Sequence, residues 1–548
     1  MTKTGSLIGK LFSIRNRYGE GISIRKSEIL DRLPSHKIKI KKDFGTFYDT
    51  LLFLIAYPDN KSIYQQALRS LDKLREELRS QKRLQAALYN TGITGTSLCA
   101  VFGFEIVKYL RNLHPHHIRI NCFEADESHI RYIISVVMPK VESEILQDAN
   151  AEWRSWLLGS KRKEEELLDR LIAVFDQADL RPEIRDELWN ALGVEVEIDL
   201  SAHTCLPDSL VSPYYHRSLV REKKDILETA EIPIPVKLTE YEAGQIIHCG
   251  RMILVKHLRE IDPVTFTAAA YVSYYQMGRG LSIALLGMRP ERRHPIDSYM
   301  GYLVFKNGLP ISYAGSWILF DSARIGLNIF PSFRGGESRY IFGEILSLHK
   351  NVYRLSRFSV DPYQIGKENS EGIKSGSFWT YYQAGFRPLG EEQKRISATE
   401  QIKIRTVSGY RSPAAVLKKL AASRMELVLD TKAFRLDATD LSRVYARLLK
   451  NRFENNRRLA ESYCFNRLVE ILGIENFQEA KMNFILKNWS VLLLSEEEEL
   501  KNDAKLISSI KYLFEYKANG NEEKYIALLS KTKQLRRLFY RLAGGQTG

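Results

Sequence analysis

Cysteine is scarce in this chain, and its scarcity excludes the protein classes that depend on it. The 548 residues include five cysteines, an odd number, and no two of them form a Cys-x-x-Cys pair. A disulfide framework and a zinc ribbon both need paired cysteines at short, regular spacing. Because reduced thiols are typical of the cytoplasm, the sequence predicts a cytoplasmic protein.

Long apolar runs are also missing, which argues against a membrane protein. No stretch approaches the roughly 18 apolar residues that a transmembrane helix needs. The basic N-terminus, residues 1–26, lacks the apolar core of a secretory signal, and a transit peptide is the alternative to a solvated tail. The cluster His114-Pro115-His116-His117 has no cysteine or acidic partner at a known metal-binding spacing, so we predict no metal site.

Acidic residues are too few to balance the basic ones. The chain has 81 Lys and Arg against 66 Asp and Glu, for a net charge of +15. This excess favours an anionic partner, such as a phosphorylated cofactor, a nucleic acid or an anionic membrane surface. Beyond residues 531–541, no segment interleaves basic and aromatic residues densely, so nucleic acid is not the favoured partner.

The order of predicted elements divides the chain into three regions. Residues 1–232 are mainly helical by pattern, residues 233–409 alternate strands and helices, and residues 410–548 are helical again. The alternating prolines of Glu231-Ile232-Pro233-Ile234-Pro235 mark the first boundary, and Ser408-Gly409 marks the second. The sequence therefore predicts a mixed α/β (α+β) fold, with a mixed central sheet flanked by helices.

In the first region, apolar spacing predicts helices at residues 68–78, 98–110, 153–175 and 186–192, with strands at 118–123 and 132–137 as the alternative for part of it. In the last region, one apolar stripe predicts a helix through residues 441–449, and further helices are expected from residue 496 and across residues 531–541.

The central region carries the chemistry-bearing pattern. Asn307-Gly308 between two β-rich runs predicts a hairpin of residues 302–305 and 311–313, and strands at 317–320 and 325–330 follow. Next come a turn with two glycines, a helix at 339–350, a strand at 357–360, a polar loop at 363–372 and a helix at 377–384. Glycine lets the backbone approach an anion, and the N–H groups at a helix start point towards it. The pattern predicts a site for a phosphate-bearing cofactor.

Two short motifs in this region resemble a known family. Arg334-Gly335-Gly336-Glu337-Ser338-Arg339 is similar to the pyrophosphate loop of the GNAT superfamily of acyl-CoA-dependent N-acyltransferases, usually Arg/Gln-x-x-Gly-x-Gly/Ala. The segment Tyr381-Tyr382-Gln383-Ala384-Gly385-Phe386 is similar to the family's closing Tyr-x-x-x-Gly-Phe. The resemblance covers roughly residues 240–400, and Glu337 stands where the family has its second glycine.

The resemblance implies roles for particular residues. It implies that acyl-CoA or acetyl-CoA is the co-substrate and that an unidentified amine accepts the acyl group. The expected cofactor contacts are the residues of the loop, the end of the preceding strand and one asparagine: Phe330, Arg334, Gly335, Gly336, Ser338, Arg339 and Asn369. In the family, the strand that corresponds to residues 325–330 of this chain separates from its neighbour. The backbone groups freed in this way bind the acyl and pantetheine parts of the cofactor.

Tyr381 is the candidate general acid, because the departing thiolate needs a proton donor within hydrogen-bond reach. For the general base, which deprotonates the incoming ammonium, Glu337 is one candidate. The sequence does not choose between it and four other residues of the same region: Asp321, Asp361, Glu371 and His294. Asn369 is expected either to contact the cofactor or to hold the polar loop.

Three functions stay open. The first is N-acyl transfer from acyl-CoA or another thioester. The second is a catalytically degenerate scaffold of the same fold, which the negative charge of Glu337 and the shifted position of Asn369 favour. The third is a transferase that takes its acyl group from an aminoacyl-tRNA, which the positive charge would suit. A homo-oligomer is left open, and the helical flanks are expected to supply either substrate specificity or oligomer contacts.

Overall fold

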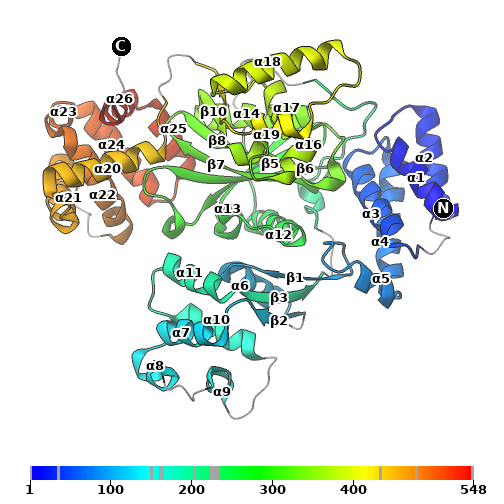
Figure 1. Ribbon diagram of the computed structural model, residues 1–548, viewed down its shortest axis with the longest axis horizontal. Helices are drawn as coiled ribbons and strands as arrows, with labels where there is room; N and C mark the ends of the chain where they lie inside the picture. Colours follow the sequence, from blue (N-terminus) through cyan, green and yellow to red (C-terminus); the bar gives the residue numbers. More distant parts are fainter. Residues whose placement is uncertain are drawn as a thin grey trace. The chain divides into compact units, whose positions relative to one another are not determined.

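The computed structural model describes residues 3–33, 38–115, 117–147, 152–159, 166–200, 204–222, 234–430, 435–474 and 479–544. These residues form two compact units. Unit 1 consists of residues 1–207, 215–217 and 248–260, and unit 2 consists of residues 208–214, 218–247 and 261–548. The fold class is mixed α/β, as predicted, with a large mixed sheet and helices towards both termini (Figure 1).

Unit 1 combines a helical part with a small sheet. Its described helices are α1 (Lys3–Ile14), α2 (Glu20–Arg32), α3 (Lys41–Ala56), α4 (Lys61–Arg79), α5 (Lys82–Ala87), α6 (Phe104–Leu113), α7 (Glu127–Val137), α8 (Lys140–Gln147), α9 (Trp153–Leu158), α10 (Leu167–Gln177) and α11 (Pro182–Leu192). The strands β1 (Ser97–Val101), β2 (Ile118–Phe123) and β3 (Val194–Asp199) pair antiparallel in the order β1-β3-β2. Helix α12 (Glu240–Lys256) begins in unit 2 and ends in unit 1.

Several predictions for unit 1 are confirmed and two are wrong. Strand β2 matches the prediction, and the helices predicted at 68–78 and 186–192 are parts of α4 and α11. The segment 98–110 divides into β1 and α6, because Phe102 and Gly103 interrupt it and a short apolar strand has no pattern distinct from a buried helix. Residues 132–137 are the end of helix α7 and not a strand.

The predicted helix at 153–175 corresponds to α9 and α10, and residues 160–165 between them lie outside the described part.

Unit 2 is built on a mixed sheet to which nine described strands belong. They are β4 (Thr267–Gly278), β5 (Leu281–Met288), β6 (Ser298–Lys306), β7 (Leu309–Leu319), β8 (Ser322–Ile325), β9 (Asn328–Ile329), β10 (Arg357–Val360), β11 (Arg387–Pro388) and β12 (Met425–Val428). The order is β11-β12-β10-β8-β7-β6-β5-β4, and β9 pairs with β7. Among the described strand pairs of this sheet, β8 and β10 are the parallel pair and all the others are antiparallel.

The described helices of unit 2 follow the strands in the chain. They are α13 (Asp262–Thr265), α14 (Ser338–Tyr353), α15 (Pro362–Ile365), α16 (Ser370–Ser375), α17 (Ser377–Gln383), α18 (Glu391–Thr406), α19 (Ala414–Leu420), α20 (Ala438–Phe453), α21 (Arg457–Leu472), α22 (Ala480–Leu493), α23 (Glu497–Lys501), α24 (Ala504–Ala518), α25 (Glu522–Lys531) and α26 (Lys533–Leu542). Helices α14 and α17 cover one face of the sheet, and α13 lies on the other (Figure 1).

The strongest local signals in the central region are confirmed. The hairpin of β6 and β7 turns on Asn307 and Gly308, whose φ angles of 45° and 82° suit a two-residue turn that needs positive φ at both positions. Strand β10 and helices α14 and α17 also lie where the sequence predicts them. The polar loop at 363–372 is partly wrong as a prediction, because α15 and α16 occupy much of it.

The strand predicted at 325–330 is interrupted. It divides into β8 and β9 at Gly326 and Leu327, and both pieces pair with β7. The residues predicted as a separate strand at 317–320 belong mostly to the end of β7.

The C-terminal helices are part of unit 2. Lys517 of α24 donates from Nζ to the Asp297 carbonyl over 3.0 Å and to Ser298 Oγ over 3.3 Å, and it pairs with Glu522. Ser530 of α25 donates to the carbonyl of Tyr353 over 3.0 Å, and Arg536 pairs with Asp321 over 2.5 Å. These groups are buried. The domain boundary predicted near residue 409 falls inside unit 2. Part of the boundary predicted at residues 231–235, namely residues 231–233, lies outside the described part of the chain.

Candidate functional site

The glycine turn joins β9 to α14. A short 3₁₀ helix at Pro331–Phe333 ends the strand, and Gly335 takes a φ of 89°, which favours glycine. Helix α14 begins at Ser338, so its first N–H groups face the turn. Arg334 and Arg339 are exposed on either side of the glycines. The turn therefore has the backbone and the flanking charge of an anion site.

Beside this turn, the two parallel strands of the sheet part. Arg357, Phe358 and Ser359 of β10 are in register with Ser322, Ala323 and Arg324 of β8, and beyond this point β9 pairs with β7 alone. Phe330 is buried, its N–H donates to the carbonyl of Ile311 over 3.0 Å, and its ring stacks on Tyr313 at 5.4 Å. The strands thus leave an opening in their ladder next to Gly326 and Leu327.

Tyr381 lies at this opening, on the side of α14. Its ring packs against Phe342 at 5.3 Å and Phe386 at 5.7 Å, and the residue is buried. Burial raises the pKa of Tyr381, and the backbone of Leu327 partly opposes the rise. Apart from the Leu327 backbone, no described residue makes a hydrogen bond with the Tyr381 hydroxyl. Because buried polar groups are nearly always satisfied, such a hydroxyl is a functional candidate.

Glu337 is buried beneath the turn in a network of cations. Its carboxylate pairs with Lys306 Nζ at 2.7 Å and with Arg279 Nη2 at 2.7 Å, and it accepts from the Val220 N–H over 2.9 Å. Burial by itself would raise the pKa of Glu337, but Lys306, the Val220 N–H and Arg279 hold that pKa below its usual value. For Lys306, burial lowers the pKa and Glu337 opposes the change.

Residues 220 and 221 contact the same turn. Arg221 donates from Nη1 to the carbonyls of Gly335 and Gly336 over 3.1 and 3.0 Å. Both bonds use carbonyl oxygens and none of the N–H groups of the turn, of which that of Gly336 donates to the Phe333 carbonyl over 3.3 Å.

Asn369 holds the polar loop, which is one of the two roles expected for it. Its side chain accepts from the Gly372 N–H over 3.0 Å at the start of α16 and donates to the Tyr363 carbonyl over 3.0 Å. Both bonds hold the loop before α17. The same loop reaches the glycine turn, since Glu371 pairs with the exposed Arg334.

The remaining candidates for a general base lie in different places. Asp321 is buried against Arg536 and Ser356, and Glu371 pairs with Arg334. His294 lies against Trp317, with its ring centroid 4.8 Å away. Asp361 follows β10 directly and lies where β8 and β10 part. Of the five candidates, only Asp361 is partly exposed at the opening.

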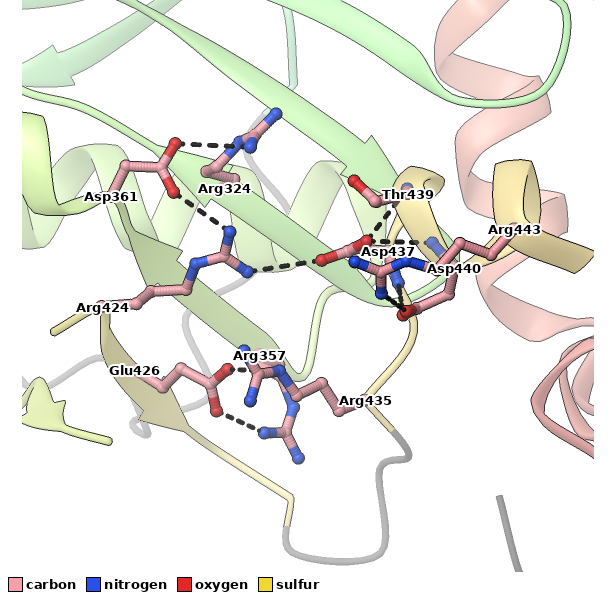
Figure 2. Close-up of polar contacts among 10 residues, drawn as sticks. All are labelled: Arg324, Arg357, Asp361, Arg424, Glu426, Arg435, Asp437, Thr439, Asp440 and Arg443. Carbon is pink, nitrogen blue, oxygen red and sulfur yellow. Dashed lines mark hydrogen bonds and ion pairs between the residues drawn. The ribbon is translucent and has the colours of Figure 1, made fainter. Parts of the chain in front are cut away.

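Asp361 belongs to a row of ion pairs across β8, β10 and β12, shown in Figure 2. It forms ion pairs with Arg324 Nη1 and Arg424 Nη2, each at 3.3 Å, and Arg424 pairs with Asp437 at 3.4 Å. Farther along, Glu426 pairs with Arg357 at 2.7 Å and with Arg435 at 3.3 Å. Asp437 also caps α20 by accepting from the N–H groups of Thr439 and Asp440.

Sequence reasoning missed most of these charged partners. Lys306, Arg279 and Arg221 are far from the glycine turn in the chain, as are Arg324 and Arg424 from Asp361. One signal was available: Arg324 interrupts an otherwise apolar strand between Ala323 and Ile325, which places it on the opposite face from its neighbours.

A scan against protein-family models, a search of curated proteins and a search of solved structures each find no match for this chain. In the ranges that the structure describes, no helix is long and apolar enough to cross a bilayer. No group of three or more metal-ligating His, Cys, Asp or Glu side chains occurs among the same residues.

Proposed function

We propose that unit 2 is an N-acyltransferase that moves an acyl group from acyl-CoA, or another thioester, to an amine. The observation that carries the proposal is the opening between β8 and β10. The glycine turn and the buried Tyr381 hydroxyl both adjoin this opening. An anion site and a buried proton donor next to free strand backbone are the parts that thioester transfer needs.

The donor would lie along the opening. N–H groups of the glycine turn and the first turn of α14 would hold a pyrophosphate, helped by Arg334 and Arg339. The edge of β9 that faces away from β7 would line the acyl and pantetheine part. The cation network of Glu337 supports this role, because Lys306 and Arg279 neutralise the carboxylate beneath the pyrophosphate position.

The thioester supplies the acyl carbon, to which the amine nitrogen bonds as the carbon–sulfur bond breaks. Tyr381 gives its proton to the departing sulfur and takes one back from the attacking nitrogen, so an amide and a free thiol result. Asp361 accepts the proton that the ammonium must lose first. Glu337 serves to hold the turn, because its carboxylate is fully buried, whereas the Asp361 carboxylate is partly exposed where β8 and β10 part.

Calorimetric titration of the full chain with acetyl-CoA tests the proposal. We expect micromolar binding that Arg339→Glu weakens at least tenfold, since the new charge repels the pyrophosphate. Arg443→Glu is the matched control, because Arg443 is equally exposed but lies on α20. Undetectable binding, or equal binding by both variants, would overturn the proposal.

Binding without transfer is the second candidate function. Arg221 and the Val220 N–H tie residues 220–221 to the glycine turn, as expected if this turn is held for a binding role alone. A chain that binds acetyl-CoA and yields no free thiol with any amine would favour this scaffold.

A further inference from the structure

The opening between β8 and β10 has a second side, away from Tyr381. Register places Tyr299, Trp317, Arg324 and Ser359 in one row across β6, β7, β8 and β10. The neighbouring row, which includes Ser316 and Ile325, faces α14, because His349 of that helix contacts Ser316 Oγ at 3.3 Å. Since Phe342 of α14 packs on Tyr381, Arg324 points to the opposite face.

An aromatic wall adjoins Arg324 on this second face. The rings of Tyr299 and Trp317 stack at 4.1 Å with an interplanar angle of 11°, and the Arg324 guanidinium lies 5.7 Å from the Trp317 ring. Pro263 of α13 lies close to Gly301 two positions along β6, where an added Cβ would approach the proline to 2.7 Å. The row therefore has an apolar end at Trp317 and a charged end at Arg324.

The charged end is accessible, and its charges balance when Asp437, which pairs with Arg424 at 3.4 Å, is included. Side-chain exposure is 42% for Arg324, 34% for Asp361 and 26% for Arg424. One carboxylate lies between two guanidinium groups, and Figure 2 shows all three directed towards one another. An anion that took both guanidinium groups would leave the Asp361 carboxylate without a partner, and a simple ammonium that took Asp361 would leave Arg324 without its carboxylate. Either loss costs free energy in a partly buried place.

A zwitterion avoids that cost. Its ammonium can pair with Asp361 while its anionic group takes the two guanidinium groups, so each broken ion pair is replaced. Arginine also suits a planar carboxylate or a phosphate, which it can bind through two donors.

We propose that Arg324, Asp361 and Arg424 form the acceptor site, and that the acceptor is a small amine carrying a carboxylate or a phosphate. The inference rests on the proposed acyl transfer, because Arg324 and Asp361 lie where the pairing of β8 and β10 ends. Arg324 and Arg424 bind the anionic group, and Asp361 holds the ammonium beside the opening. Trp317 contacts the apolar part of the acceptor.

Ligand-observed NMR saturation transfer with the full chain tests this site without any donor. The probes are the twenty L-amino acids and O-phosphoethanolamine, each compared with the amine that lacks the anionic group, such as ethanolamine. We expect at least one zwitterion to give a signal that its simple amine does not. Comparing the signals of the L-amino acids with that of O-phosphoethanolamine shows whether the site binds a carboxylate or a phosphate.

Variants locate the binding. Arg324→Gln and Asp361→Asn should each weaken the binding of that zwitterion at least tenfold, while Arg443→Gln, on α20 and paired only with Asp440 among the described residues, should leave it unchanged. The inference is overturned if every simple amine binds as well as its zwitterion, if no probe binds, or if neither variant weakens binding. Circular dichroism of each variant shows whether the fold is kept.

This result separates the two proposals. Acetyl-CoA binding without zwitterion binding would refute the acceptor site and leave acyl transfer standing. Zwitterion binding without acetyl-CoA binding would retain the site and refute the donor.

Discussion

Glu337 shows how a residue in a cofactor motif can serve the fold instead. Two buried or half-buried cations, Lys306 and Arg279, and one backbone N–H converge on its carboxylate. Such a carboxylate stabilises the protein only while its partners stay paired, because an uncompensated buried charge is costly. Replacing Glu337 should therefore change the free energy of unfolding more than it changes the rate of acyl transfer.

Glu337→Gln should destabilise unit 2 by about 3 kcal/mol, because Lys306 would stay buried without its counter-charge. Urea unfolding followed by near-UV circular dichroism measures this change. Glu371→Gln is the matched control, since the Arg334–Glu371 pair is about half exposed and should contribute less than about 1 kcal/mol. Equal effects of the two substitutions would contradict the assigned role of Glu337.

Tyr381→Phe separates catalysis from folding. We expect acyl transfer to slow by about 100-fold or more, because a positioned proton donor contributes this much. The melting temperature should change little, since in the described part of the chain the buried hydroxyl has no hydrogen-bond partner other than the Leu327 backbone. Free thiol release and calorimetry of acetyl-CoA measure the rate and the affinity. A transfer rate equal to that of the wild type would remove Tyr381 from the mechanism.

At the residue scale, the sequence identified candidate residues but not the side chains with which they interact. Gly335 and Tyr381 stand out in local motifs, and the structure places both beside the opening of the sheet. Lys306 and Arg324 do not stand out, because their partners lie 31 and 37 residues away in the chain. Long-range ion pairs leave no pattern in a single sequence.

At the scale of elements, helix α14 connects the glycine turn to the sheet. His349 in this helix is fully buried, with Nδ1 2.8 Å from the Ile345 carbonyl and its ring 5.3 Å from Tyr302. Burial lowers the pKa of His349 from 6.5 to about 4. The imidazole is therefore neutral in the folded protein near pH 5, whereas it is largely charged in the unfolded chain.

This difference makes the packing of α14 sensitive to acid. A lowered His pKa means that the unfolded state binds a proton first, so stability is lost as pH falls from about 6.5 to about 4. A shift of this size corresponds to about 3 kcal/mol. The stability difference between wild type and His349→Gln should shrink by that amount between pH 7 and pH 4 in urea unfolding. A pH-independent difference would show that His349 titrates normally.

Element positions were predicted best where the signal was local. The Asn307-Gly308 turn and the four residues of β10 are read from a few neighbouring side chains. The interruption at Gly326 and Leu327 was missed, because a strand that changes partners keeps its apolar pattern. The segment 98–110 failed for a related reason, since strand β1 and helix α6 are both apolar and only Gly103 separates them from one continuous pattern.

At the scale of the whole molecule, the C-terminal region completes the sheet. Strand β12 lies between β10 and β11, and α24 and α25 hold the start of β6 through Lys517 and Glu522. The sequence predicted helices there, but a four-residue strand among them gave too weak a signal to place.

A chain ending at residue 409 should therefore lose the fold of unit 2. Without β12, the strand β10 has an open edge beside the proposed site. Limited proteolysis with mass spectrometry should find cleavage within residues 267–360 under conditions in which the full chain resists. Residues 38–115 of unit 1 provide the internal control and should stay resistant in both chains. Equal resistance of residues 267–360 would show that the C-terminal region is dispensable.

The most direct test of the proposed donor site is hydrogen–deuterium exchange of the full chain with and without acetyl-CoA. We predict slower exchange in peptides that cover residues 325–341 and 377–386, because the donor would occupy the glycine turn and the opening beside Tyr381. Peptides from α20 to α22 should be unchanged. Unaltered exchange across residues 325–341 at saturating acetyl-CoA, or protection confined to other parts of the chain, would contradict the account.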